Sequence, residues 1–574
     1  MAVERARPTL SCREYPPMHL SLLAGSALAL LFAAAAPAQP PQTRQSARGE
    51  APPAASGASD RREGAASRAE DKKDWAQAPV AEQTRSSEHS VAVGGRIIHY
   101  RSTAGTLTIR DAQGKPTASV FYVAYTAAPS GRRRPVTFFY NGGPGSASLW
   151  LHMGSFAPMR VQTANPEYIR PAPYAFGPNP DTLIDRTDLV FIDAVGSGYS
   201  RPLGDAKPAD FYGVDQDVDA FAKAIMRYVT RNARWNDPKV IFGESYGTTR
   251  SAALAYALQD RGMALNGVVL LSSILNYGIR QPGFDQLYIG YLPSYAATAW
   301  YHRKAGAGTE LEAFVEQARQ FANGPYAAAL AKGQDISPQE QDQVAQAMSR
   351  FTGLSPDFLR RTNLRVDLSR FQAELLRDRR QTIGRFDSRY LGTNPDAAGE
   401  RPDYDPSDTA ISGAFISTFH DYLTREIGYD TDLDYRVSAR EGGDFRWNWE
   451  HRAPGAGSGP QQQPAVTVDL AAAMRTNPYL RVLSLNGYYD MATPFFSTER
   501  DLKHMMLEPS QRGNLEFHYY QAGHMVYLNP DELHRMRLDL DRFYDTIPGE
   551  AASPTPPQPA SVGRARGAAS RPPN

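Results

Sequence analysis

The chain has 574 residues, of which 41% are hydrophobic and 10% aromatic, so it is long enough for one large domain with insertions or for two to three domains. Its formal net charge of +1 argues against nucleic acid or an anionic membrane as the main partner. Cys12 is the only cysteine, which excludes an intrachain disulfide.

The first 38 residues have the pattern of a secretory signal peptide. Arg5, Arg7 and Arg13 precede an apolar run at residues 20–36, and Ala36–Ala38 forms a small-x-small cleavage site. An uncleaved membrane anchor is the weaker alternative, because the run is short for a span. We therefore expect export to the periplasm or secretion, followed by loss of the signal and no stable membrane insertion.

Two methionines are candidates for the first residue of the protein. Met18 could be the first residue instead of Met1, but the signal would then have almost no basic region. Residues 39–87 and 548–574 are rich in Pro, Ala and Ser and lack hydrophobic periodicity. Both stretches are predicted to be disordered, as a linker and a tail.

The sequence pattern of residues 88–280 predicts antiparallel hairpins first, and then alternating strands and helices. Strands are predicted at 91–93 and 96–100 around Gly94-Gly95, then at 106–110 and 118–125 around a turn at 111–115. Short apolar runs typical of buried parallel strands follow at 136–140, 189–193, 240–242 and 267–271, with a helical pattern at 215–230. This order predicts a mixed sheet that becomes parallel.

Residues 281–470 break this alternation. Helical stretches such as 308–323 and 338–351 dominate, with loops at 394–409 and 453–464. The earlier pattern returns in residues 471–547, with strands at 481–486 and 515–520 and a helix at 531–544. We therefore expect an α/β protein whose mixed, mostly parallel central sheet comes from two chain segments, separated by a largely helical cap insertion.

Gly243-Glu244-Ser245-Tyr246-Gly247 lies between a predicted strand and a predicted helix. A G-x-S-x-G sequence in this setting is the nucleophile elbow of α/β-hydrolases, which holds the serine in a tight turn. An ordinary strand-to-helix turn is the alternative, and the flanking elements make it the weaker one. Ser245 is the predicted nucleophile, and the N–H of Tyr246 is one oxyanion donor.

A serine nucleophile needs a base and a carboxylate that orients the base, in the chain order Ser, Asp or Glu, His. His524 follows the strand at 515–520 in a turn of small residues, whereas the other histidines after Ser245 lack such a setting. Asp490 ends the preceding strand. The chain has no HExxH motif or Cys/His cluster, so neither a metal nor another cofactor is expected.

A second oxyanion donor is expected from Asn141–Ser146, a glycine-rich loop that follows the strand at 136–140. A phosphate-binding loop is the weaker alternative. The sequence lacks Gly-Lys-Ser/Thr, and Pro144 has no N–H to donate.

Five motifs together resemble the serine carboxypeptidases, the carboxypeptidase Y-like exopeptidases with an α/β-hydrolase fold. They are NGGPGS at 141–146, DAVGSGYS at 193–200, GESYG at 243–247, GYYD at 487–490 and AGHM at 522–525. The similarity extends over residues 88–544 and is strongest outside the insertion. The asparagine before GGPG and the glutamate before the serine distinguish this family from ordinary esterases and lipases.

The resemblance implies hydrolysis of the C-terminal peptide bond of peptides or proteins. It gives the roles of nine residues: Ser245 as nucleophile, His524 as general base and acid, Asp490 as its orienting partner, Gly143 and Tyr246 as oxyanion donors, Asn141, Gly142 and Glu244 as the grip on the terminal carboxylate, and Met525 in the wall of that pocket.

Three positions depart from the family pattern. Ser146 replaces a cysteine, Phe139 replaces a tryptophan, and Ser155 stands where a second carboxylate-gripping glutamate is expected. The last change leaves two alternatives beside an exported carboxypeptidase. One is an esterase or acyltransferase on the same scaffold. The other, which the complete triad disfavours, is a binding protein without activity.

Overall fold

A computed structural model describes residues 78–128, 133–443, 445–457 and 459–549. The predicted signal peptide, most of the predicted linker and residues 550–574 of the tail lie outside this part. Among the residues described, no helix is long and apolar enough to cross a membrane.

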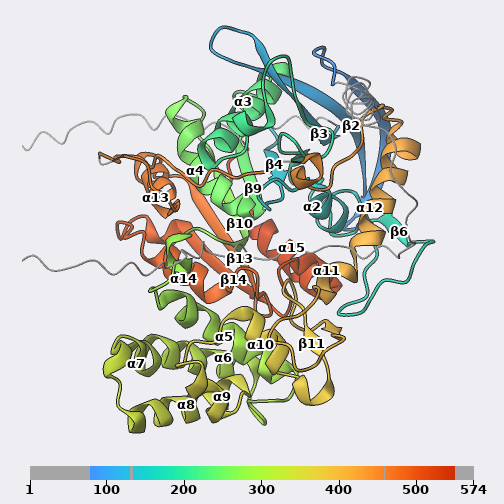
Figure 1. The fold of residues 1–574 in the computed structure, drawn as a ribbon. Coiled ribbons are helices and arrows are strands. Elements are labelled where there is room, and N and C mark those ends of the chain that lie inside the picture. The colour runs from blue at the N-terminus through green and yellow to red at the C-terminus, as the bar shows by residue number, and fades with distance from the viewer. Residues whose placement is uncertain (1–77, 129–132, 444, 458, 550–574) are drawn as a thin grey trace, which may run out of the picture. The chain divides into compact units, whose positions relative to one another are not determined.

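A ten-stranded mixed sheet forms the centre of the described region (Figure 1). Its strands are β1 (Thr84–Val93), β2 (Arg96–Arg110), β3 (Pro116–Ala127), β4 (Val136–Tyr140), β7 (Asp188–Ile192), β8 (Arg201–Pro202), β9 (Lys239–Ser245), β10 (Gly267–Ser273), β13 (Arg481–Gly487) and β14 (Leu515–Tyr520). Their order is β1-β2-β3-β7-β4-β9-β10-β13-β14, with β8 paired to β3. The pairs from β7 onward are parallel and the others antiparallel. The predicted mixed, mostly parallel sheet is therefore confirmed.

The N-terminal hairpin shows where the sequence signal was too weak. Val93 pairs with Arg96 across the predicted Gly94-Gly95 turn. β2 is one continuous strand, whereas the sequence suggested two pieces, because its middle consists of small and polar residues that nevertheless pair with both β1 and β3. β1 begins at Thr84, so the prediction of a disordered linker is wrong for residues 84–87. Strand pairing and the Glu82–Arg227 ion pair, rather than apolar burial, order this segment.

Two layers of helices cover the two faces of the sheet, and each layer has its own hydrophobic cluster. One cluster includes residues of α2 (Leu149–Gly154), α12 (Ser412–Asp421) and α15 (Pro530–Asp545). The other includes residues of α3 (Val214–Arg231), α4 (Tyr246–Asp260) and α13 (Thr467–Thr476). Side chains alternate along β4, where Phe139 faces the first cluster and Phe138 the second. α13 crosses the predicted boundary between residues 470 and 471.

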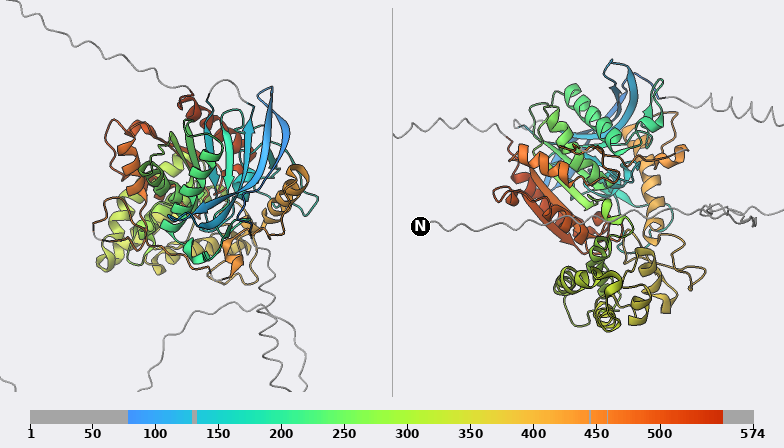
Figure 2. Two further views of the ribbon diagram at one scale, coloured as in Figure 1. Left: turned by 90° about the horizontal axis from the view of Figure 1, so that it is seen from above. Right: turned by 60° about the vertical axis from the view of Figure 1, so that its left-hand side comes forward.

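The insertion has two halves of different construction. Its first half is a helical bundle that lies at one end of the sheet in Figures 1 and 2. The bundle comprises α5 (Gln286–Tyr301), α6 (Leu311–Phe321), α7 (Ala327–Leu330), α8 (Pro338–Thr352), α9 (Pro356–Arg361) and α10 (Leu368–Glu374). The second half of the insertion, residues 377–466, contains the short antiparallel pair β11 (Thr382–Ile383) and β12 (Leu391–Gly392), followed by α11 (Pro406–Thr409) and α12. The helices expected at 308–323 and 338–351 correspond to α6 and α8.

Candidate active site

The turn between β9 and α4 has the geometry of a nucleophile elbow. Ser245 has φ 61° and ψ −129°, in a region that side-chain-bearing residues rarely adopt. A Cβ on Gly243 would lie 2.2 Å from the Gly247 carbonyl oxygen, and one on Gly247 would lie 2.8 Å from the Tyr140 carbonyl oxygen. Both glycines are therefore required by close backbone contacts, as the motif predicted.

Asp490 and His524 form a buried hydrogen-bonded pair. Nδ1 of His524 lies 2.8 Å from Oδ2 of Asp490. The other oxygen, Oδ1, accepts the backbone N–H groups of Ala492 and Thr493 at 2.8 and 2.9 Å. Burial lowers the pKa of His524, but the charge and hydrogen bond of Asp490 outweigh it, and the net pKa is raised. The pair can therefore hold a proton that His524 accepts from a nucleophile.

The three predicted triad residues lie at or just beyond the carboxyl ends of β9, β13 and β14. These strands and β10 are consecutive in the sheet, and Ser273 of β10 pairs with Ser245. The hydroxyl of Ser272 donates to the His524 carbonyl oxygen at 2.6 Å, which ties the histidine loop to the end of β10. The charges of His524 and Asp490 both influence the pKa of Glu244, the neighbour of Ser245. The sheet thus brings the ordered Ser, Asp and His to one edge.

The glycine-rich loop after β4 packs directly against the elbow. A Cβ on Gly142 would lie 2.3 Å from the Tyr246 backbone nitrogen, so only glycine fits there. Gly143 follows with φ 106°, a conformation that favours glycine. Gly142 therefore lies against the backbone nitrogen of Tyr246, and the loop that carries Gly143 adjoins one of the two predicted oxyanion donors.

Glu244 is a buried carboxyl group, 1% exposed, next to the nucleophile. The hydroxyl of Tyr527 donates to its Oε2 at 2.9 Å, and the polar side chain of Asn141 lowers its pKa. Burial raises the pKa of Glu244 to about 7, against the opposing influence of His524 and the Tyr527 hydrogen bond. A protonated Glu244 can therefore donate a hydrogen bond to an anion at neutral pH.

Three further positions bear on the predicted carboxylate pocket: Asn141, Met525 and Ser155. Oδ1 of Asn141 accepts the Leu151 N–H at 2.9 Å, which fixes the side chain. Met525 is buried next to His524. Ser155 is fully buried, and its hydroxyl donates to the Leu151 carbonyl oxygen at 2.5 Å. Ser155 is thus committed to its own helix end.

Three residues with evident roles at the site were missed by the sequence analysis. Thr493 donates to Oδ2 of Asp490 at 2.7 Å, and Tyr527 bonds to Glu244. Arg250 is fully buried, pairs with Asp217 and donates to the Asn141 carbonyl oxygen at 2.8 Å. A threonine three residues after Asp490 and an arginine five residues after the nucleophile match no motif. Only their contacts in the structure show that they support the site.

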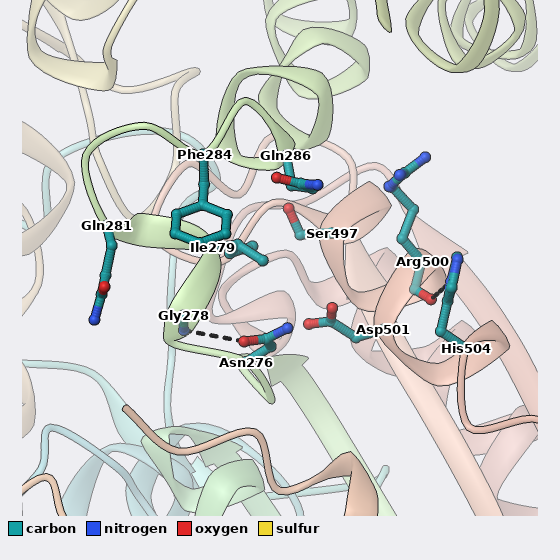
Figure 3. A pocket seen from close by; sticks show the side chains of 10 residues that line it. All are labelled: Asn276, Gly278, Ile279, Gln281, Phe284, Gln286, Ser497, Arg500, Asp501 and His504. Atoms are coloured by element: carbon teal, nitrogen blue, oxygen red, sulfur yellow. Dashed lines mark hydrogen bonds between the residues drawn. The ribbon is translucent and has the colours of Figure 1, made fainter. Parts of the chain in front are cut away.

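A separate pocket of about 450 Å³ lies between the loop after β10 and α14 (Phe495–Lys503), as Figure 3 shows. Its lining includes Asn276, Phe284 and Asp501, but none of the triad residues. The N–H of Gly278 donates to Oδ1 of Asn276 at 3.0 Å. This pocket is therefore not the predicted active site.

The strand order, the elbow and the positions of Asp490 and His524 after the later strands define an α/β-hydrolase. The serine carboxypeptidase family model matches residues 95–287, a segment that contains the NGGPG loop and the elbow. The match confirms the family resemblance drawn from the motifs and indicates a serine-type hydrolase. Asp490 and His524 lie outside the matched segment, and their pairing is a feature of this structure.

Two of the solved structures found to be similar to this chain are as follows. A proline iminopeptidase from Mycobacterium smegmatis is 15% identical, with a TM-score of 0.31, and the match covers 77% of this chain and 97% of that one. A thermostable carboxyl esterase from Bacillus coagulans is 11% identical, with a TM-score of 0.32, over 77% and 98% of the two chains. Such distant similarities carry no information about the substrate. A search of curated protein sequences finds no match.

Proposed function

We propose that the protein is an exported serine carboxypeptidase that releases C-terminal amino acids through an acyl-enzyme on Ser245. The observation that carries this proposal is the buried carboxyl of Glu244, which lies next to the nucleophile in the chain and accepts a hydrogen bond from Tyr527. A protonated carboxyl in a desolvated site is suited to a substrate carboxylate, because it can donate to one oxygen without adding a second negative charge. An internal peptide segment offers no such anion.

The proposed reaction assigns one step to each of these residues. His524 removes the proton of Ser245 as the serine oxygen attacks the last peptide carbonyl, and Asp490 stabilises the imidazolium. The N–H groups of Gly143 and Tyr246 stabilise the oxyanion. His524 then gives its proton to the leaving amino group, and the free amino acid departs. A water molecule, activated by the same histidine, hydrolyses the acyl-enzyme and restores Ser245.

Incubation with a mixed pool of synthetic peptides, followed by mass spectrometry, tests the proposal. We expect stepwise loss of single residues from the C-terminus, and no such loss with Ser245→Ala. Products of internal cleavage, or no trimming by a protein that still reacts with a fluorophosphonate probe, would contradict it.

An esterase or acyltransferase is the second candidate, and Ser155 favours it. A buried serine at this position supplies no second carboxyl for a substrate carboxylate. Matched peptides with a free C-terminal acid or a C-terminal amide separate the candidates, because only a carboxypeptidase should prefer the free acid. A protein without activity would fail to label with the probe at all.

Export is part of the same proposal and rests on the N-terminal sequence. Mass spectrometry of the protein from its native host should find a mature N-terminus near Gln39. Retention of residues 20–36 on the active protein would instead support an anchor. Because the expected mature chain has no cysteine, its activity should not depend on a disulfide-forming system.

A further inference from the structure

A five-residue stretch of the insertion, residues 385–389, is bonded to both loops that carry the acid and the base. We call it the clamp segment. The Ser388 N–H donates to the Tyr489 carbonyl oxygen at 3.1 Å, and the Met491 N–H donates to the Arg385 carbonyl oxygen at 3.1 Å. The clamp segment therefore holds the residues on both sides of Asp490.

The same segment holds the histidine loop. The His524 N–H donates to the Phe386 carbonyl oxygen at 2.6 Å, and the Phe386 ring lies 5.2 Å from the imidazole, centre to centre. The Gly523 N–H donates to Oδ2 of Asp387 at 3.1 Å. A Cβ on Gly523 would lie 2.4 Å from the Asp387 Cβ, so the clamp segment and the histidine loop are in close backbone contact.

A buried ion pair fixes the clamp segment. Arg389 contacts Asp387 through Nε at 2.9 Å and Nη2 at 2.5 Å. Its Nη1 also donates to the Gln521 carbonyl oxygen at 2.8 Å, and its Nη2 to Oδ1 of Asn165 at 2.6 Å. One planar guanidinium thus joins the insertion, the histidine loop and the loop after β5 (Met159–Val161).

We infer that the Asp387–Arg389 pair is a positioning element of the catalytic machinery, which sets where His524 lies relative to Asp490. Removing two charges from water is costly, and such pairs seldom stabilise a protein more than apolar residues would. What Arg389 contributes is a fixed position of the clamp segment against the histidine loop. A displacement of His524 there would slow the reaction. The inference rests on the proposed role of His524, while Asp387 and Arg389 themselves take no part in bond making.

Arg389→Lys tests this assignment. Lysine keeps the positive charge but lacks the fork needed to reach Asp387, Gln521 and Asn165 together. Arg537→Lys is the matched control, because Arg537 has a similarly buried side chain, 7% exposed against 5% for Arg389, and pairs with Asp185 away from the triad. Both variants should lose similar thermal stability.

Activity should separate them when both are assayed well below their unfolding temperatures. We expect Arg389→Lys to lower kcat about tenfold with little change in KM, and Arg537→Lys to keep kcat within about twofold. The rate at which a fluorophosphonate labels Ser245 should fall in parallel, because it also needs His524 but involves no substrate carboxylate. Asp387→Asn, which keeps an acceptor for Gly523, should lose less than Arg389→Lys.

Normal kcat and labelling rate in a folded Arg389→Lys protein would overturn the inference. If Arg389→Lys does not fold, Asp387→Asn decides: full activity and labelling would count against the clamp, and a loss of both would support it. The labelling assay also separates this inference from the proposed function. A parent protein that labels but does not trim peptides would refute the carboxypeptidase, while the clamp could still be judged from labelling rates.

Discussion

The two halves of the insertion are attached to the molecule in different ways. The helical bundle, α5–α10, buries residues such as Leu292, Val315 and Phe371 in a hydrophobic cluster that is separate from the two clusters on the faces of the sheet. Side chains from the Asp490 loop and α14 also belong to this cluster. The second half has no separate cluster: Ile383 joins the bundle cluster, Phe415 joins the core on one face of the sheet, and Val466 joins the core on the other face. The half with less regular structure is therefore the one that is integrated into the α/β core.

The second half also borders the site on two sides. The clamp segment lies against the histidine, and the Trp447 ring lies 5.3 Å from that of Tyr246, the residue after the nucleophile. Phe445 approaches the oxyanion loop so closely that a Cβ on Gly145 would lie 2.8 Å from it. Substitutions in the second half should thus affect chemistry, and substitutions in the bundle that do not touch the Asp490 loop should affect chiefly local stability.

The largest effect should come from neither half, because the sheet carries the triad. Ser245→Ala, His524→Ala and Asp490→Asn should each lower kcat by on the order of 10⁴ or more while the protein stays folded. Their combined loss should not exceed the largest single loss, since the three residues act as a unit. Steady-state kinetics with circular dichroism as the folding control measure this, and a Ser245→Ala protein with a tenth of the parent rate would refute the assignment.

A matched pair of phenylalanines tests the structural contrast between the halves. Phe415, which packs on Trp150, and Phe371, which stacks on Tyr295 at 3.9 Å, are both fully buried. Each change to alanine should cost about 3–5 kcal/mol by leaving a cavity. Phe415→Ala should speed hydrogen exchange throughout the sheet, whereas Phe371→Ala should speed it mainly in α5–α10. Equal changes in both regions for both variants would show that the halves are not distinct.

Much of the sheet could be predicted because its signals are local. Buried parallel strands such as β4 and β10 are short apolar runs, and the elbow needs glycines that stand out in the sequence. β1 was partly missed because pairing with β2 and ion pairs hold it, and polar strands leave little trace in composition.

The triad could be predicted because each member ends a recognisable strand in a fixed chain order. The residues that support it could not be predicted. The clamp segment lies more than 100 residues before His524 in the chain, within loops that have no periodicity, and Arg389 has no feature that separates it from other arginines. Contacts between distant segments decide such roles, and a single sequence does not contain them.

The next prediction concerns Glu244, a residue of the α/β core. No hydrogen bond described above links Glu244 to the second half of the insertion. With a pKa of about 7, Glu244 is protonated below neutral pH and can donate to the substrate carboxylate; above it, the ionised group repels that carboxylate. The ratio of kcat/KM for a free-acid peptide to that for its amide should fall about tenfold between pH 5 and pH 8.

Glu244→Gln keeps a donor at every pH and should flatten this ratio. Peptide hydrolysis at neutral pH should then improve relative to acid pH. Tyr527→Phe is a useful companion, because it removes one hydrogen bond to Glu244 and leaves its charge. A parent ratio that is flat between pH 5 and pH 8 would mean that Glu244 does not bind the terminal carboxylate, and would favour the esterase or acyltransferase.

The smallest expected effect concerns Arg385, an exposed residue of the second half that begins the clamp segment. Among the groups that face His524, Asp490 and Glu244 raise its pKa and Arg385 lowers it, because a nearby cation disfavours the imidazolium. Arg385→Gln should therefore raise the pKa of His524. The base must be neutral to accept the serine proton, so the acid limb of the rate profile should move to higher pH.

Water screens an exposed charge, and we expect this shift to be at most about half a pH unit. The acid limb is best measured with a C-terminally amidated peptide, so that the titration of Glu244 against a substrate carboxylate does not contribute. High salt should reduce the difference between Arg385→Gln and the parent. Arg370→Gln, at a partly exposed arginine of α10, is the control from the other half and should not move the limb. A shift to lower pH in Arg385→Gln would mean that Arg385 does not act on His524 through its charge, and the influence of the second half would then be limited to the contacts of the clamp segment.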